Sequence, residues 1–193
     1  MAKILSSTEI VTGEVRLSYA HLFTPTLPAN ALPGQQAKYS VCLLIDKKDE
    51  KTLSLIRDAV KHAYEAGIPS KFGGKAPKKW HDPLRDGDDE KDLDKNPEYA
   101  GCYFINCSSQ RKPGLVDRRG VEIIDPDEIK SGDYAKADIN FFPYSNTGNS
   151  GVGCSVNNVL KTRDGEPLGG TGFSAEAAFA GELLDGDDDD DLI

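Results

Sequence analysis

The stretch from Gly132 to Gly165 constrains the fold most, because it predicts two long strands joined by one turn. Over residues 134–144, apolar residues alternate with polar or aromatic ones, which is typical of a half-buried strand. Residues 145–151 are rich in turn formers, and a second alternating run follows over 152–161. The residues predicted to face the core are Ala135, Ala137, Ile139, Phe141, Val152, Cys154, Val156, Asn158 and Leu160.

The other face of the first strand carries Lys136, Asn140, Phe142 and Tyr144. Aromatic rings beside a cation and an amide suit the stacking of bases and the neutralisation of phosphates, as in binding of single-stranded nucleic acid. In the alternative interpretation, Phe142 and Tyr144 lie under another segment and fill a core. The strand alone leaves both interpretations open.

Composition bounds the class of protein. A chain of 193 residues fits one domain, and its 19 glycines and 11 prolines favour a β-rich fold with many turns. It contains no apolar run long enough to span a bilayer. The four cysteines form no CxxC pair, so we expect reduced thiols in a cytoplasmic protein.

The remaining segments predict further strands and one helix. Residues 9–20 read as a strand, with Val15, Leu17 and Tyr19 on one face and a bend at Gly13. Residues 23–36 read as a loop, 38–46 as a buried strand, and 99–108 and 115–124 as further strands. Residues 49–67 have an amphipathic helical period, with Asp46 or Asp49 as the N-cap.

Together these elements predict a mainly β fold. They fit a partly open, five-stranded barrel of the OB-fold type, with one well-defined helix and long loops. A generic β-sandwich is the competing architecture.

Charge is unevenly distributed along the chain. The net charge is −9, but ten acids and no base follow Arg163, which leaves residues 1–163 with about one net positive charge. We expect residues 1–181 to form the domain and residues 182–193 to form a disordered acidic tail. Such a run can lie in a basic groove as a weak mimic of polyphosphate, while its apolar end contacts a partner. The predicted partner-binding residues are Asp187, Asp188, Asp189, Asp190, Asp191, Leu192 and Ile193.

Cations and aromatic residues near predicted loops complete the candidate nucleic-acid site. Trp80 follows Lys78 and Lys79 in a long loop, which suits stacking with phosphate contacts nearby. Alternatively, Trp80 anchors that loop to the core. The predicted nucleic-acid-binding residues are Lys78, Lys79, Trp80, Arg111, Lys112, Arg118, Arg119, Lys136, Phe142 and Tyr144.

Catalysis has little support in the sequence. No nucleophile elbow, zinc-protease, phosphate-loop or dinucleotide motif occurs, and the acids after Asp86 do not match a calcium loop. A zinc site from His81, Cys102, Cys107 and Cys154 lacks a ligand-spaced pair. We therefore predict no enzyme, cofactor or metal. A metal-dependent nuclease using the acids over 82–94 is the less favoured alternative.

The run FFPYSNTGNSGVGCSVNNVLKTRDGEPLGG, the strand YAGCYFINCSS and the acidic terminus carry a family resemblance. Over residues 5–181 the chain resembles phage-encoded single-stranded-DNA-binding proteins with an OB-fold. The resemblance implies sequence-tolerant binding of single-stranded DNA in phage replication, recombination or repair, in the cytoplasm of the infected host. It also implies a tail that competes with DNA and recruits replication or recombination proteins. A homo-oligomer is compatible with the sequence, and an acidic adaptor or DNA mimic is the alternative function.

Overall fold

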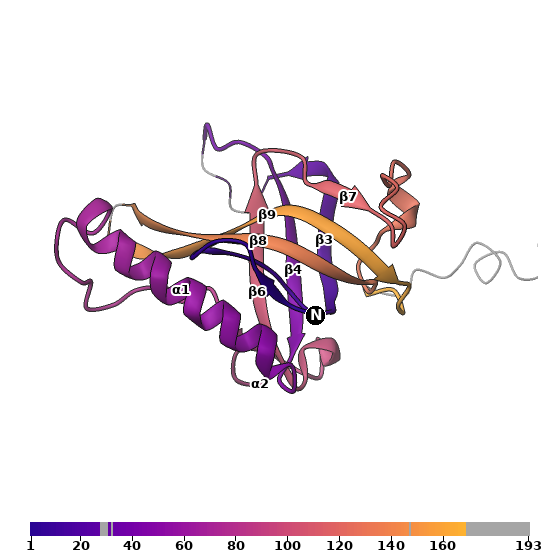
Figure 1. The fold of residues 1–193 in the computed structure, drawn as a ribbon, viewed down its shortest axis with the longest axis horizontal. Coiled ribbons are helices and arrows are strands. Elements are labelled where there is room, and N and C mark those ends of the chain that lie inside the picture. Colours follow the sequence, from indigo (N-terminus) through magenta and orange to yellow (C-terminus); the bar gives the residue numbers. More distant parts are fainter. Residues whose placement is uncertain (28–30, 32, 147, 169–193) are drawn as a thin grey trace, which may run out of the picture.

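The structure is a computed structural model that describes residues 1–27, 31, 33–146 and 148–168. Its described part is mainly β, with one long helix, α1 (Glu50–Ser70), running alongside the hairpin of β8 and β9 (Figure 1). The strands are β1 (Lys3–Ile4), β2 (Glu9–Val11), β3 (Val15–Thr26), β4 (Lys38–Asp46), β5 (Arg85–Asp86), β6 (Cys102–Ser109), β7 (Gly114–Val116), β8 (Tyr134–Asn146) and β9 (Asn149–Arg163). The short helices are α2 (Gly87–Glu90) and the 3₁₀ turns η1 (Pro97–Tyr99) and η2 (Pro126–Glu128).

The strands form one curled sheet in the order β1-β2-β8-β3-β4-β6-β5, with β9 paired to β8 and β7. The free side of β9 curls toward β6, and the Sγ atoms of Cys107 and Cys154 lie 3.2 Å apart across this seam. In the described chain no backbone ladder joins β6 to β9, so the barrel is partly open. This half-barrel confirms the predicted OB-like architecture over a sandwich.

The β8–β9 hairpin confirms the central prediction and corrects two details. Ala135, Ala137, Ile139 and Phe141 are all buried, as alternation predicts. The strands run on to Asn146 and resume at Asn149, so the expected seven-residue turn was too long. The pairing shifts register between Asp138 and Ile139, which lie opposite Asn158 and Val156.

This bulge reverses the alternation of β9. Beyond it Val159 is fully buried and Asn158 is exposed, so the prediction that Asn158 and Leu160 face the core was wrong. The extra residue in one strand changes which face each later side chain occupies.

Gly13 separates β2 from β3, as the predicted bend requires. Its N–H donates to the Thr52 hydroxyl at 2.9 Å, and a Cβ at this position would lie 2.5 Å from a carboxylate oxygen of Asp49. The bend therefore brings the start of α1 against the sheet, and only glycine leaves room for it.

Helix α1 begins as predicted but ends later. Asp49 is the N-cap, and its carboxylate accepts from the Thr52 N–H at 3.1 Å. The helix continues through Pro69, whose missing N–H costs only one bond in the last turn. Gly67 does not end the helix; it packs closely against Phe72 and Pro143.

Two further segments differ from expectation. β3 extends to Thr26, into the predicted loop, and the strand predicted over 115–124 is reduced to β7, which ends at Val116 and pairs in parallel with β9. The acidic tail and residues 169–181 lie outside the described residues. Within the described ranges, no helix has the length and hydropathy of a transmembrane segment.

Candidate nucleic-acid interface

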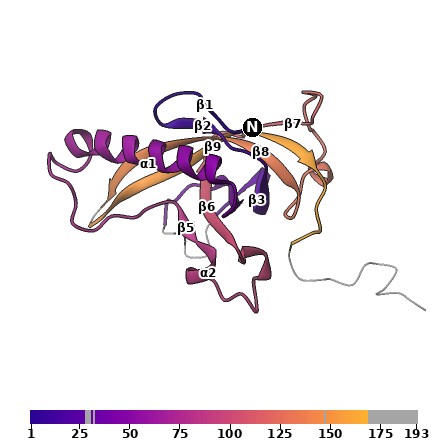
Figure 2. The ribbon, with the colours of Figure 1, turned by 60° about the horizontal axis from the view of Figure 1, so that its bottom comes forward.

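The candidate site lies on the outer face of β3, β4 and β6. Along β4, Val41, Leu43 and Ile45 point into the main core, so Ser40, Cys42 and Leu44 occupy the opposite face. At the Leu44 end this outer face is covered by Tyr99 and Phe104. Figure 2 shows the α2 region on the side of the sheet away from β1 and β2. At the Ser40 end the face is open.

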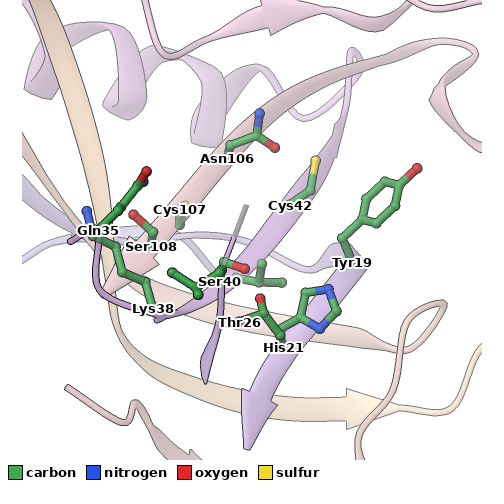
Figure 3. A pocket seen from close by; sticks show the side chains of 12 residues that line it. Tyr19, His21, Thr26, Gln35, Lys38, Ser40, Cys42, Asn106, Cys107 and Ser108 are labelled. Atoms are coloured by element: carbon green, nitrogen blue, oxygen red, sulfur yellow. The ribbon is translucent and has the colours of Figure 1, made fainter. Parts of the chain in front are cut away.

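A groove of about 610 Å³, here called the strand groove, occupies this open end. It crosses the three strands and reaches the loop between β3 and β4 (Figure 3). Its lining residues are Tyr19, His21, Thr26, Leu27, Gln35, Lys38, Ser40, Val41, Cys42, Asn106, Cys107 and Ser108. The lining thus combines an aromatic ring, a cation and several hydrogen-bonding groups.

A second groove of about 640 Å³, here called the tip groove, lies between the loop before β5 and the end of the β8–β9 hairpin. The His81 backbone holds that loop on β9: its N–H donates to Ser150 O at 3.0 Å, and its carbonyl accepts from Val152 N at 3.1 Å. The lining residues are Trp80, His81, Asp82, Pro83, Leu84, Arg85, Glu90, Asn106, Tyr144, Val152, Gly153 and Cys154.

Asn106 lines both grooves, so they meet at β6. Its side-chain amide makes no hydrogen bond within the described part of the chain and is available to a ligand. The joined track runs from the β3–β4 loop, across the strands, to the hairpin tip. OB-folds bind oligonucleotides across a strand face and with loops at its edges.

Tyr19 does not share the face of Leu17, as the predicted alternation of this strand required. Leu17 is fully buried, whereas Tyr19 is 59% exposed. The register between β3 and β4 shifts between the pairs Ser18–Cys42 and His21–Ser40, so β3 contains a bulge there. Tyr19 has φ +47°, a left-handed conformation that costs a non-glycine residue roughly 1–2 kcal/mol.

The burial pattern of β3 agrees with this bulge. Leu17 and Leu22 are both buried, yet a spacing of five cannot place two residues on one face of a regular strand. One extra residue resolves this conflict and turns both Tyr19 and His21 outward. Lys38 and Asn106 were not predicted either, because a single lysine or asparagine in a strand carries no distinctive pattern.

Trp80 has a structural contact as well as a place in the tip groove. Its ring centroid lies 4.7 Å from that of Tyr64 on α1, and the side chain packs against the main core. The anchoring interpretation therefore has direct support. Tyr144 lines the same groove, so the structure brings these two predicted residues together.

Phe142 lies over β9 at Gly153, where a Cβ would come within 2.7 Å of its ring. Phe142 is 40% exposed and is not among the lining residues of either groove. Neither Phe142 nor Tyr144 belongs to the core, which answers the alternative raised by the sequence.

The predicted cations fall in different places. Lys78 and Lys79 are exposed immediately before Trp80. Arg111 is exposed just beyond the end of β6, and the Lys112 ammonium lies 5.1 Å from the ring centroid of Phe23 on β3. These four residues are therefore near the ends of the joined track.

Three other cations lie elsewhere. Lys136 lines a separate pocket with Met1 and Lys3. Arg118 and Arg119 lie beside η2, and Arg119 forms an ion pair with Asp117 at 2.9 Å. The structure does not bring these three cations to the grooves.

Two of the acids considered for a nuclease are held in ion pairs. Lys47 binds the carboxylates of Asp86 and Asp88 at 2.6 and 2.8 Å. No three His, Cys, Asp or Glu side chains gather as metal ligands in the part of the chain that the structure describes. Burial raises the pKa of the Cys42 thiol to about 11, so this thiol stays protonated and is a poor nucleophile at neutral pH.

The fold and the grooves define an OB-like half-barrel with an open, partly aromatic track across its strands. Residues 8–193 match the family model described as "Enterobacter phage Enc34, ssDNA-binding protein", and the chain belongs to this family. Membership of a family of DNA-binding proteins confirms the prediction that the chain is not an enzyme. A search of curated proteins found no match.

Solved structures agree with this assignment. The single-stranded DNA-binding protein of bacteriophage Enc34 in complex with ssDNA is 26% identical, with a TM-score of 0.70 over 85% of this chain and 91% of that chain. Bacteriophage T7 gp2.5, a single-stranded DNA-binding protein, is 18% identical, with a TM-score of 0.59 over 94% of this chain and 98% of that chain. At that identity the likeness to gp2.5 shows a shared fold alone.

Proposed function

We propose that this protein binds single-stranded DNA without strong sequence preference, in the track formed by the strand groove and the tip groove. The observation that carries the proposal is the meeting of the two grooves at Asn106, on the strand face that OB-folds use. Membership of the Enc34 family and the solved complex of a relative with ssDNA support it.

The residues along the track have the chemistry that this ligand requires. Tyr144 and the accessible part of Trp80 offer rings for base stacking at the tip, while Lys78 and Lys79 neutralise phosphates beside them. Lys38 supplies a cation at the other end. Arg111 and Lys112 extend this end, whereas Lys136, Phe142, Arg118 and Arg119 contribute less because they lie outside both grooves.

We also propose that the protein acts in phage DNA replication, recombination or repair in the host cytoplasm. In this proposal residues 1–181 form the binding domain. The tail over 182–193 competes with DNA for the track, and its end recruits replication or recombination proteins. Five consecutive aspartates followed by Leu192 and Ile193 support this role by their charge and apolar end.

The test is a fluorescence-polarisation titration of labelled single-stranded and duplex oligonucleotides across a salt series. The full-length protein is compared with a protein ending at Gly181. We expect preference for the single strand, a steep salt dependence and tighter binding after truncation. Absence of binding by both proteins at low salt would contradict the proposal and favour an acidic adaptor. Unchanged affinity after truncation would contradict the role of the tail alone.

A further inference from the structure

We infer that Tyr19 is the principal base-stacking residue of the strand groove, and that the β3 bulge exists to present it. This inference rests on the proposed function and assigns the groove a specific contact. Bulges are common next to functional sites, where they redirect a side chain that a regular strand would bury. Here the redirected side chain is an aromatic ring.

The exposure of the ring distinguishes Tyr19 from the other aromatic residues near the track. Trp80 is packed on Tyr64, and Phe142 lies on the backbone of Gly153. Tyr19 is 59% exposed and makes no ring–ring or cation–ring contact within the described residues. Its ring can therefore receive a base without breaking an existing contact.

The backbone of Tyr19 is held in an unfavourable conformation by its neighbours. It is the one non-glycine residue in the described chain with positive φ. The next residue, Ala20, donates its N–H to the Ser131 hydroxyl at 2.9 Å. Before the bulge, Leu17 exchanges backbone hydrogen bonds with residues 132 and 133 at 2.7 and 2.8 Å. Strain that persists because the surroundings enforce it is concentrated at functional sites.

The surroundings of the ring suit a nucleotide. His21 follows on the same strand, Lys38 lies at the start of β4, and all three residues line one groove (Figure 3). Lys38 forms no ion pair within the described ranges, so its charge is available to a phosphate. Ser40, Asn106 and Ser108 provide hydrogen-bonding groups across the groove floor. A stacked base at Tyr19 would thus have a cation and polar groups within the same groove.

The positive φ allows a test that separates binding from folding. Tyr19→Gly removes the ring and also relieves the strain, because glycine adopts this conformation at no steric cost. The melting temperature of the full-length protein should stay within about 4 °C of wild type. Its affinity for labelled oligothymidylate should fall about tenfold or more, the scale expected for loss of one stacked base.

Two further variants and a control complete the experiment. Tyr19→Asn also tolerates this φ and should lose affinity similarly, whereas Tyr19→Phe keeps the ring and should bind within about threefold of wild type. Ile124→Ala is the control, because Ile124 is 76% exposed and lines neither groove. Wild-type affinity in folded Tyr19→Gly and Tyr19→Asn proteins would overturn the inference while leaving the proposed function intact. Absence of binding by the wild-type protein would overturn both.

Discussion

The outer face of β4 and β6 differs between its two ends. At one end Leu44 and Phe104 are fully covered, and the Phe104 and Tyr99 rings meet edge to face with centroids 5.2 Å apart. Two residues along β6, Asn106 lies in the open and makes no side-chain hydrogen bond within the described chain. The same strands therefore complete a core at one end and leave polar groups unpaired at the other, where a ligand can bind.

Charged side chains also differ in how they are paired. Near the start of β8, the buried carboxylate of Asp133 accepts from Lys130 N at 3.0 Å and from Gly165 N at 3.1 Å, and lies 3.2 Å from the Lys161 ammonium. In the strand groove, Lys38 has no such partner among the described residues. The paired charges of Asp133 and Lys161 stabilise the fold, whereas the ammonium of Lys38 is available to bind a phosphate.

The largest expected effect is on the covered end. Phe104→Ala removes a fully buried ring and should lower the free energy of unfolding by about 3–5 kcal/mol, because a cavity replaces it. Asn106→Ala, on the same face of the same strand, should change it by less than about 0.5 kcal/mol. Urea unfolding measures both, and equal losses would contradict the distinction between the two ends.

The second largest effect on stability is expected at the buried carboxylate of Asp133. Asp133→Asn should cost about 1.5–3 kcal/mol, because it removes the charge that strengthens the hydrogen bonds from Lys130 N, Gly165 N and the Lys161 ammonium, although Lys161 keeps its ion pair with Asp164. Although burial by itself would raise the pKa of Asp133, the backbone hydrogen bonds and Lys161 hold it below the ordinary value. The carboxylate of Asp133 therefore binds a proton more readily in the unfolded chain than in the folded one. Its contribution to the free energy of unfolding is complete above about pH 4–5 and is lost as the pH falls through its pKa in the folded protein.

Urea unfolding of Asp133→Asn and wild type between neutral and acid pH tests this. The difference in stability should shrink toward acid pH. A difference that stays constant would show that the charge of Asp133 is not what stabilises this region.

The next prediction, of a smaller effect, compares the contributions of Tyr144 and Phe142 to the affinity for DNA. Tyr144→Ala should weaken binding of single-stranded DNA by about 1–3 kcal/mol, because Tyr144 lines the tip groove. Phe142→Ala should weaken it less, since that ring lies outside both grooves. Fluorescence polarisation measures both, with circular dichroism to verify folding. A greater loss of DNA affinity in Phe142→Ala than in Tyr144→Ala would indicate that DNA binds to the outer face of the hairpin and not in the tip groove.

The smallest effect concerns the unpaired cation. Lys38→Ala should leave stability unchanged and reduce the slope of log affinity against log salt by about 0.7, the loss of one phosphate contact on a single strand. Lys51→Ala on α1 is the matched control, because Lys51 is exposed and lines neither groove. If Lys38→Ala and Lys51→Ala had the same slope of log affinity against log salt, Lys38 would not contact a phosphate.

Local pattern was sufficient for most of the fold. Alternation identified Ala135 to Phe141 as core, helical periodicity located α1, and Asp49 was among its two predicted caps. The shared groove of Trp80 and Tyr144 could not be predicted, because 64 residues separate them and the groove depends on the pairing of His81 with β9. For the same reason the sequence could not separate the cations near the track from Lys136, Arg118 and Arg119.

Local periodicity and composition were enough to predict most of the longer strands, helix α1 and many apolar residues of the core, and the resemblance of particular sequence runs indicated the family. Which side chains face the core after a bulge depends on the folded structure. Tyr19 is therefore exposed and Val159 is buried, although alternation alone predicts neither. The folded structure also decided which half of the β4–β6 face is covered. The physical reason is that a bulge and a cover depend on distant partners, such as Ser131 for β3 and Tyr99 for β4, whose positions no local pattern contains.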